Sequence, residues 1–270
     1  MTSVAEQAPV AGRAGVGAAS EIVREIARGG LAGLAVGVVV IGIGGRVVMR
    51  LAALLVPASA GSVTENGNRI GDITLDGSVA LIVFAGLLFG LAAGVVWVVI
   101  APWIPGTGIR RALLAMPIAI TLAGFFLIQG DNPDFAILQH NVLVVGLLLG
   151  LLGLVGFAVA RGDDLLDRRL PHVGTGSRVM ALVYSVLTGV GLLFLFPVVA
   201  VYFSDGGSIP VAVALLATGG VTVVWWVLRL RGRQEPPRNL VIAGRAALLV
   251  AVIVGSMAVA PEVADALAVS

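Results

Sequence analysis

The sequence predicts an all-α membrane protein, a bundle of about seven transmembrane helices. Of its 270 residues 59% are hydrophobic and 12% are charged, and the mean hydropathy is +1.07. A soluble domain carries about 25% charged residues, so the excess apolar surface should face lipid. Seven long apolar runs divide the chain, each near or above the roughly 20 residues that a helix needs to cross the hydrocarbon layer. The loops between the runs carry arginine and carboxylate in alternation.

The apolar runs place seven helices and two tails. The helices are expected at residues 31–56, 79–104, 110–129, 137–160, 179–203, 209–230 and 240–260. The chain thus divides into a cytoplasmic tail with a juxtamembrane helix (1–29), a seven-helix transmembrane domain (30–260) and an extracytoplasmic tail (261–270). Residues 1–19 lack periodicity and are predicted to be disordered. Ser20 is positioned to cap the juxtamembrane helix.

The arginines predict the orientation of the chain in a plasma membrane. They cluster in the amino-terminal segment and in every second loop thereafter, and Arg69 is the single arginine in the opposite loops. The positive-inside rule therefore places the amino terminus in the cytoplasm and the carboxyl terminus outside. The Ala, Gly, Val and Arg bias is typical of a GC-rich bacterial genome.

Composition excludes several kinds of chemistry. The chain has no cysteine, which excludes disulfides, thiolate metal sites and cysteine nucleophiles. All 17 cationic side chains are arginine, so a Schiff base to retinal is also excluded. The arginines are spread along membrane flanks and do not indicate nucleic-acid binding. The chain has no Ser/His pair, zinc-protease H-E-x-x-H motif, Walker loop or phosphatase signature, and we expect no cofactor and no metal.

Glycines recur at three- or four-residue spacing in three helices. Such ridges let helix backbones approach closely in lipid and predict a tightly packed bundle. The ridges are Gly33 and Gly37 in the first helix, Gly86, Gly90 and Gly94 in the second, and Gly146, Gly150, Gly153 and Gly156 in the fourth.

Arg46 and Arg50 are the exceptions to the charge pattern. They lie one helical turn apart in the outer half of the first helix, and no carboxylate falls inside any predicted helix. An arginine at that depth is costly unless it is paired or hydrated. Three interpretations remain open: a clamp by outer carboxylates, an anionic ligand, or snorkelling to the interface. The candidate clamp residues are Glu65, Asp72, Asp76, Asp131 and Asp134.

Two outer segments complete a candidate site. Strand-forming residues flank Asn66-Gly67 in the 62–77 loop, which predicts a small extracytoplasmic hairpin that could cover the arginines. Gln129 and His140 lie at the outer ends of the third and fourth helices. The hypothetical ligand site therefore comprises Arg46, Arg50, Gln129 and His140, and its ligand would be an anionic small molecule or a lipid headgroup.

One cytoplasmic segment matches a catalytic pattern. Asp163-Asp164-Leu165-Leu166-Asp167 spells the D-D-x-x-D pattern of magnesium diphosphate sites in prenyl-transferring enzymes. Asp164 and Arg168 also form an i,i+4 pair, which is typical of a solvated helical segment. The second interpretation is favoured, because the comparable Asp131–Asp134 motif lies on the other side of the membrane.

These observations favour a non-enzymatic binding or transport protein with an outward-facing arginine site. A structural or accessory subunit of a membrane complex is the alternative, and a prenyl- or lipid-modifying enzyme is a remote one. The lipid bilayer is the one partner that the composition requires.

Overall fold

Every element that the structure describes is helical. The computed structural model describes residues 8–55, 61, 79, 81–132, 135, 141–171, 178–204 and 206–268. Within these residues seven helices are long and apolar enough to cross a membrane, which confirms the predicted class. The predicted hairpin at 62–77 lies outside the described residues. The elements are α1 (Ala8–Val36), η2 (Gly37–Ile43), α2 (Gly44–Leu55), η4 (Leu81–Leu87), α4 (Leu88–Ile100), η5 (Ala101–Trp103), α5 (Gly108–Leu127), α7 (Asn141–Arg169), α8 (Arg178–Tyr202), α9 (Ile209–Leu230) and α10 (Arg238–Ala268).

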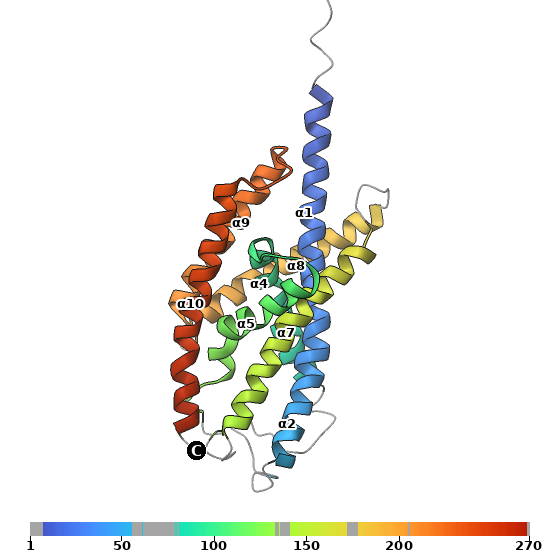
Figure 1. Cartoon of the computed structure of the whole chain (residues 1–270). Helices are drawn as coiled ribbons and strands as arrows, with labels where there is room; N and C mark the ends of the chain where they lie inside the picture. Colours follow the sequence, from blue (N-terminus) through green and yellow to red (C-terminus); the bar gives the residue numbers. More distant parts are fainter. Residues whose placement is uncertain are drawn as a thin grey trace, which may run out of the picture.

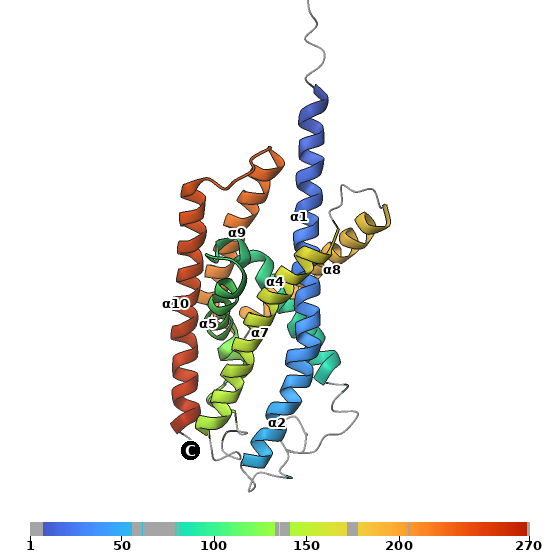
Figure 2. The same ribbon diagram turned by 45° about the vertical axis from the view of Figure 1, so that its right-hand side comes forward.

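The first span is one long rod. Helix α1, the π-helix η2 and α2 follow each other without a break, and α1 extends beyond the rest of the bundle (Figure 1). Helices α7, α9 and α10 run lengthwise with it, whereas α8 lies obliquely to them in both views (Figure 2). Helix α8 is also the least enclosed span, with 11% of its most apolar window buried against at least 22% in the others. Helix α8 therefore packs less closely on the bundle than the other spans do.

Interlocked glycines hold α1 against α4. A Cβ atom added to Gly90 would lie 2.7 Å from the carbonyl oxygen of Gly33, and one added to Gly33 would collide with the backbone of Gly90. Gly94 meets the carbonyl oxygen of Gly29 in the same way, at 2.7 Å. The π-helices η2 and η4 pack on each other at one end of this seam. The seam thus consists of backbone touching backbone, as the glycine spacing predicts.

The glycine ridge of α7 divides into two halves. Gly156 presses against the backbone of Ala115 in α5, and Gly153 packs on Met116. Gly146 and Gly150 have no atom within 4 Å of the position that a Cβ would take. The ridge therefore contributes to the bundle at one end only.

A hydrogen-bond relay ties α4 and η5 to α9. The indole N–H of Trp103 donates to Thr222 Oγ1 at 2.8 Å, and the Thr222 hydroxyl lies 2.8 Å from the carbonyl oxygen of Val99. The Trp103 ring packs on Gly244 of α10, where any side chain would collide with it. The N–H of a buried tryptophan usually has a hydrogen-bond partner, and for Trp103 that partner is Thr222.

Three helices are longer than the sequence predicts. Helix α1 begins at Ala8, so the prediction of disorder is wrong for residues 8–19, and Ser20 lies inside the helix, where its hydroxyl donates to the carbonyl oxygen of Gly17. Helix α10 runs to Ala268. Its end is held by Glu262, which accepts the backbone N–H of Gly130 at 2.8 Å, and by Asn141, which donates to the carbonyl oxygen of Ala266 at 2.7 Å. Helix α7 continues to Arg169 because ion pairs hold its end.

Candidate functional site

The predicted outer site is only partly within the described residues. Arg46 and Arg50 lie on α2, where Arg46 is half-buried and Arg50 is exposed. The Nε atom of Arg46 is buried and has no hydrogen-bond partner among the described residues. Gln129 is half-buried just after α5, and Asp131 is exposed. His140, Glu65, Asp72, Asp76 and Asp134 lie outside the described residues, so the choice between clamp and ligand site stays open.

A small apolar cluster assembles that end of the bundle. Ala52 of α2, Ile128 after α5, Val144 of α7 and Ala266 of α10 belong to it. The segments that carry Arg46 and Gln129 therefore end on the same side of the molecule.

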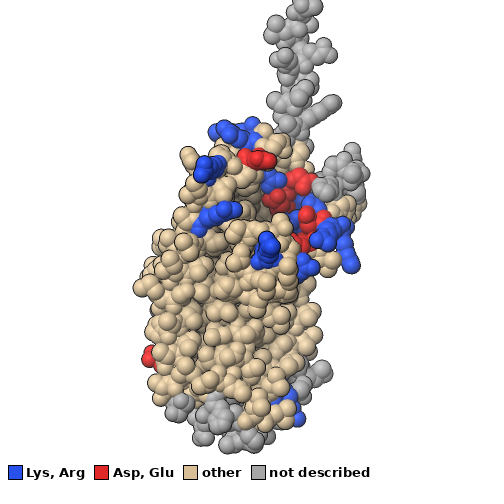
Figure 3. Space-filling model, in the orientation of Figure 1, with Lys and Arg blue, Asp and Glu red and all other residues tan. Residues whose placement is uncertain are grey.

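Most of the charged side chains visible in Figure 3 gather at the other end of the bundle, here called the arginine-rich end. Eight of them form a continuous chain of ion pairs in which arginines and carboxylates alternate. In order, the chain is Glu21, Arg24, Asp167, Arg28, Asp163, Arg111, Asp164 and Arg161. It joins α1, α5 and α7.

The strongest contacts of this chain lie between α1 and α7. Arg24 Nη1 lies 2.9 Å from Asp167 Oδ1, and its Nη2 donates to the carbonyl oxygens of Asp167 and Leu170 at 2.7 and 3.0 Å. Arg28 contacts both Asp163 and Asp167. An arginine at a helix carboxyl end satisfies its free carbonyl groups and the negative end of its dipole. Arg24 therefore closes α7 while holding α1 in place.

A second contact joins α1 to α9. Arg229 Nη1 lies 2.8 Å from both carboxylate oxygens of Glu25. The guanidinium group also stands 5.7 Å from the centre of the Trp225 ring. Helix α1 is thus the hub of the charged contacts at the arginine-rich end.

Burial shows that Asp163 is not part of a solvated segment. Its side chain is 3% exposed, as is that of Arg24. Asp164 pairs with Arg111 and Arg161 rather than with Arg168. A charge removed from water needs a partner, and each of these carboxylates has an arginine. The interpretation of residues 163–167 as a solvated stretch is therefore wrong for Asp163, whereas Leu165 and Asp167 are exposed. Its preference for ion pairing over magnesium binding fits the contacts.

A polar pocket of about 160 Å³ opens beside this chain of ion pairs. Arg111 stands over Trp97, 4.8 Å from the ring centre, and its Nη2 donates to the carbonyl oxygen of Ala101 at 3.1 Å. Trp97 is 3% exposed, and its indole Nε1 has no hydrogen-bond partner among the described residues; the same holds for Arg111 Nε. The pocket is lined by Glu25, Arg28, Trp97, Val98, Ala101, Pro102, Arg111, Asp163 and Trp225.

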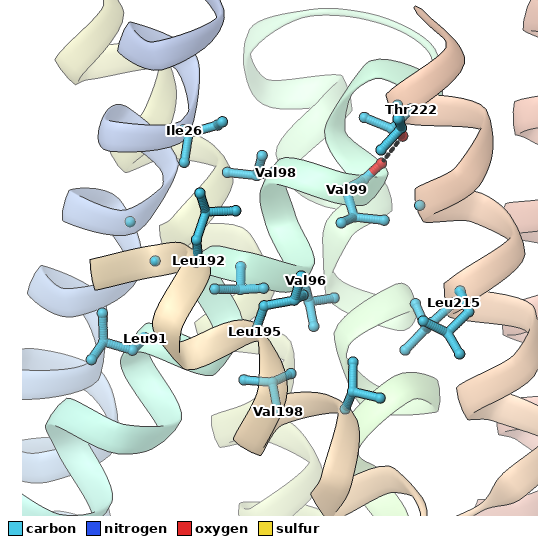
Figure 4. A pocket seen from close by; sticks show the side chains of 18 of the residues that line it. Ile26, Leu91, Val96, Val98, Val99, Leu192, Leu195, Val198, Leu215 and Thr222 are labelled. Atoms are coloured by element: carbon cyan, nitrogen blue, oxygen red, sulfur yellow. Dashed lines mark hydrogen bonds between the residues drawn. The ribbon is translucent and has the colours of Figure 1, made fainter. Parts of the chain in front are cut away.

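An apolar cavity of about 380 Å³ lies next to the polar pocket. Side chains of α1, α4, α8 and α9 surround it, among them Ile26, Val99, Leu195 and Leu215 (Figure 4). Val98 of α4 lines both the cavity and the pocket, so the two adjoin. Together they form a site with an apolar and a polar compartment.

This site offers a bound molecule hydrogen-bond donors and an apolar wall. Within the described part of the chain, no three histidine, aspartate or glutamate side chains converge as metal ligands. The carboxylates of the polar pocket are held by arginines. The arrangement is suited to holding a molecule with an apolar body and an oxygen-bearing end.

Comparison with protein-family models, with curated proteins and with solved structures finds no match to this chain. A functional assignment therefore rests on the geometry of the described residues.

The sequence contained a signal for the ion pairs at the arginine-rich end. Glu21, Arg24, Glu25 and Arg28 share one helix face, and Asp163 and Asp167 share another. The two arginines of the first face are complementary in charge to the two aspartates of the second, which predicts pairing. The sequence does not show that α1 pairs with α7, because Arg28 and Asp163 are 135 residues apart.

Proposed function

We propose that this chain is a non-enzymatic, multi-pass membrane protein that binds an amphipathic molecule from the bilayer. The observation that carries the proposal is the apolar cavity between α8 and the helices α1, α4 and α9, adjoining a polar pocket. Ligand sites are typically cavities of about 300–1,000 Å³ with apolar walls and a few polar groups. This pair of compartments has that character.

The position of α8 supports the proposal. This helix is oblique to the bundle and little enclosed, and it forms one wall of the cavity. A molecule dissolved in the bilayer would reach the cavity beside α8 without crossing a polar barrier. The proposal includes a plasma-membrane location with the arginine-rich end in the cytoplasm, which the positive-inside rule favours.

Filling the cavity tests the proposal. Gly30 of α1 lines the cavity, and nothing lies within 4 Å of the position that a Cβ would take there. We expect Gly30→Leu to fill the space and to abolish retention of a bound lipid, measured by native mass spectrometry of the full chain released from detergent micelles.

The matched control is Gly150→Leu. Gly150 is also helical and has nothing within 4 Å of its Cβ position, but it does not line the cavity. It should retain the lipid. Equal retention by both variants would refute the proposal, provided that both show the melting temperature of the native chain.

A second candidate function is favoured by the buried, unpartnered Nε of Arg46. In this candidate Arg46, Arg50, Gln129 and His140 bind an anionic small molecule or a lipid headgroup at the outer end. A guanidinium group suits such a ligand because it donates two parallel hydrogen bonds. An Arg46→Gln variant should then lose the stabilisation that phosphate or carboxylate anions give to the native chain in a thermal melt, and an unchanged response would eliminate this candidate.

A further inference from the structure

We infer that the polar pocket receives the phosphate group of a lipid whose acyl chains occupy the apolar cavity. The inference rests on the proposed function and specifies the class of ligand. It starts from two residues that line the pocket and that each carry a buried hydrogen-bond donor with no acceptor among the described residues.

The first donor is the indole N–H of Trp97. The residue is 3% exposed, so water does not solvate its ring, and no described residue accepts its hydrogen bond. A buried donor without a partner is costly, and most buried polar groups have one. Trp103 illustrates the rule in the same bundle, because its N–H is satisfied by Thr222. A ligand oxygen would give Trp97 the acceptor that it lacks.

The second donor is Arg111. Its Nε is buried without a partner among the described residues, and its Nη1 lies 3.7 Å from the nearest oxygens of Asp163 and Asp164. These contacts are longer than hydrogen bonds, so they leave the guanidinium group able to bind an anion. Arg28, by contrast, is held closely by two aspartates. Arg111 is therefore the cation available to a phosphate.

A cationic head group does not suit the pocket. Its carboxylates are engaged, Glu25 by Arg229 and Asp163 by Arg28. Its aromatic faces are engaged too, because Arg111 covers Trp97 and Arg229 stands over Trp225. Among the residues that line the pocket, an ammonium group would find neither a free carboxylate nor a free ring. Free donors beside a guanidinium group select an anionic, oxygen-rich group such as phosphate.

The arrangement of the compartments selects a lipid over a free anion. Val98 lines both compartments, so a molecule with its phosphate at Trp97 would have its acyl chains beside the cavity, one side chain away. The cavity walls are almost wholly apolar and match acyl chains. The pocket also lies at the arginine-rich end, where a lipid headgroup of that leaflet would meet it (Figure 3).

Phosphatidic acid and diacylglycerol with identical acyl chains provide the test, since they differ only in the phosphate. The full chain in detergent is titrated with each lipid, and bound lipid is counted by native mass spectrometry. We expect phosphatidic acid to bind at least about tenfold more tightly, the scale of one hydrogen bond to a charged group. Trp97→Phe should remove most of this preference, and Arg111→Lys, which retains the charge but loses the Nε–H, should reduce it.

Arg161→Lys is the matched control for Arg111→Lys. Arg161 also pairs with Asp164 in the chain of ion pairs, but it lines neither the polar pocket nor the apolar cavity. This variant should retain the preference for phosphatidic acid.

The outcomes separate this inference from the proposed function. If both lipids bind equally and Gly30→Leu abolishes both, the cavity binds lipid but the phosphate assignment is wrong. If neither lipid binds the native chain, the proposed function fails and the inference fails with it. If millimolar inorganic phosphate displaces phosphatidic acid, the pocket recognises a free anion, which overturns the lipid assignment.

Discussion

At the scale of single residues, Asp163 is the most deeply buried carboxylate in the chain of ion pairs. Its side chain is 3% exposed, and it contacts both Arg28 and Arg111. Its negative charge therefore compensates two guanidinium groups that have lost most of their contact with water. The cost of two buried cations without this partner would exceed that of losing an exposed ion pair.

We therefore predict that Asp163→Asn destabilises the protein by about 3 kcal/mol or more, the usual cost of breaking a buried ion pair. Thermal or denaturant unfolding of the purified chain in detergent would measure it. Asp164→Asn is the control, because this neighbour is more exposed and its contacts are 3.5–3.7 Å long. It should cost about 1 kcal/mol or less. Equal losses in the two variants would contradict the prediction.

At the scale of elements, the seam between α1 and α4 is a contact with no tolerance for a side chain. The backbone of Gly33 faces that of Gly90 with no room for a methyl group. Neighbouring positions on α1 differ sharply, because the Cβ position of Gly30 is open. The same residue type therefore has opposite roles one turn apart.

Gly33→Ala should separate the two helices and destabilise the protein by about 1–3 kcal/mol, as overpacking does. Gly30→Ala should be neutral or stabilising by up to about 1 kcal/mol, because alanine is the better helix former. Melting temperatures of both variants, measured in one detergent, test the pair. A Gly33→Ala variant as stable as Gly30→Ala would show that the seam is looser than described.

The elements also show what the sequence could predict and what it could not. The seven spans follow from hydropathy, because each run must reach across the hydrocarbon layer by itself. The partner of a glycine ridge does not follow. Gly146 and Gly153 look alike in sequence, yet one faces open space and the other packs on Met116. Likewise, the end of α7 is fixed by Arg24 and Arg28, which local spacing cannot reveal.

The sequence could point to individual residues of a candidate site but not to the way in which they assemble. Arg46 could be singled out from the sequence because no carboxylate lies in its span. This observation does not depend on which helices pack against it. The pocket at Trp97 arises where α1, α4, α5, α7 and α9 converge, so it depends on packing among helices distant in sequence. Its decisive feature is an indole N–H without an acceptor among the described residues, and this feature can be recognised only from the packing.

At the scale of the whole molecule, the distribution of charge predicts how the chain sits in the membrane. In the view of Figure 3, most of the arginines gather at one end, above a wide belt almost free of charged side chains. We predict that a carboxyl-terminal alkaline phosphatase fusion is active in a bacterial host and that a carboxyl-terminal green fluorescent protein fusion is dark. A fusion placed after Gly232, between α9 and α10, should behave in the opposite way. A fluorescent carboxyl-terminal fusion would contradict the seven-span orientation.

The alternating chain of ion pairs has an electrical consequence. Its four arginines and four carboxylates sum to zero. A membrane potential does work on net charge, at about 2.3 kcal/mol per elementary charge per 100 mV. If this end of α1 moved together with its partners on α5 and α7, these eight side chains would carry no net charge across the field. The cluster can therefore bind the three helices firmly without making their position sensitive to voltage.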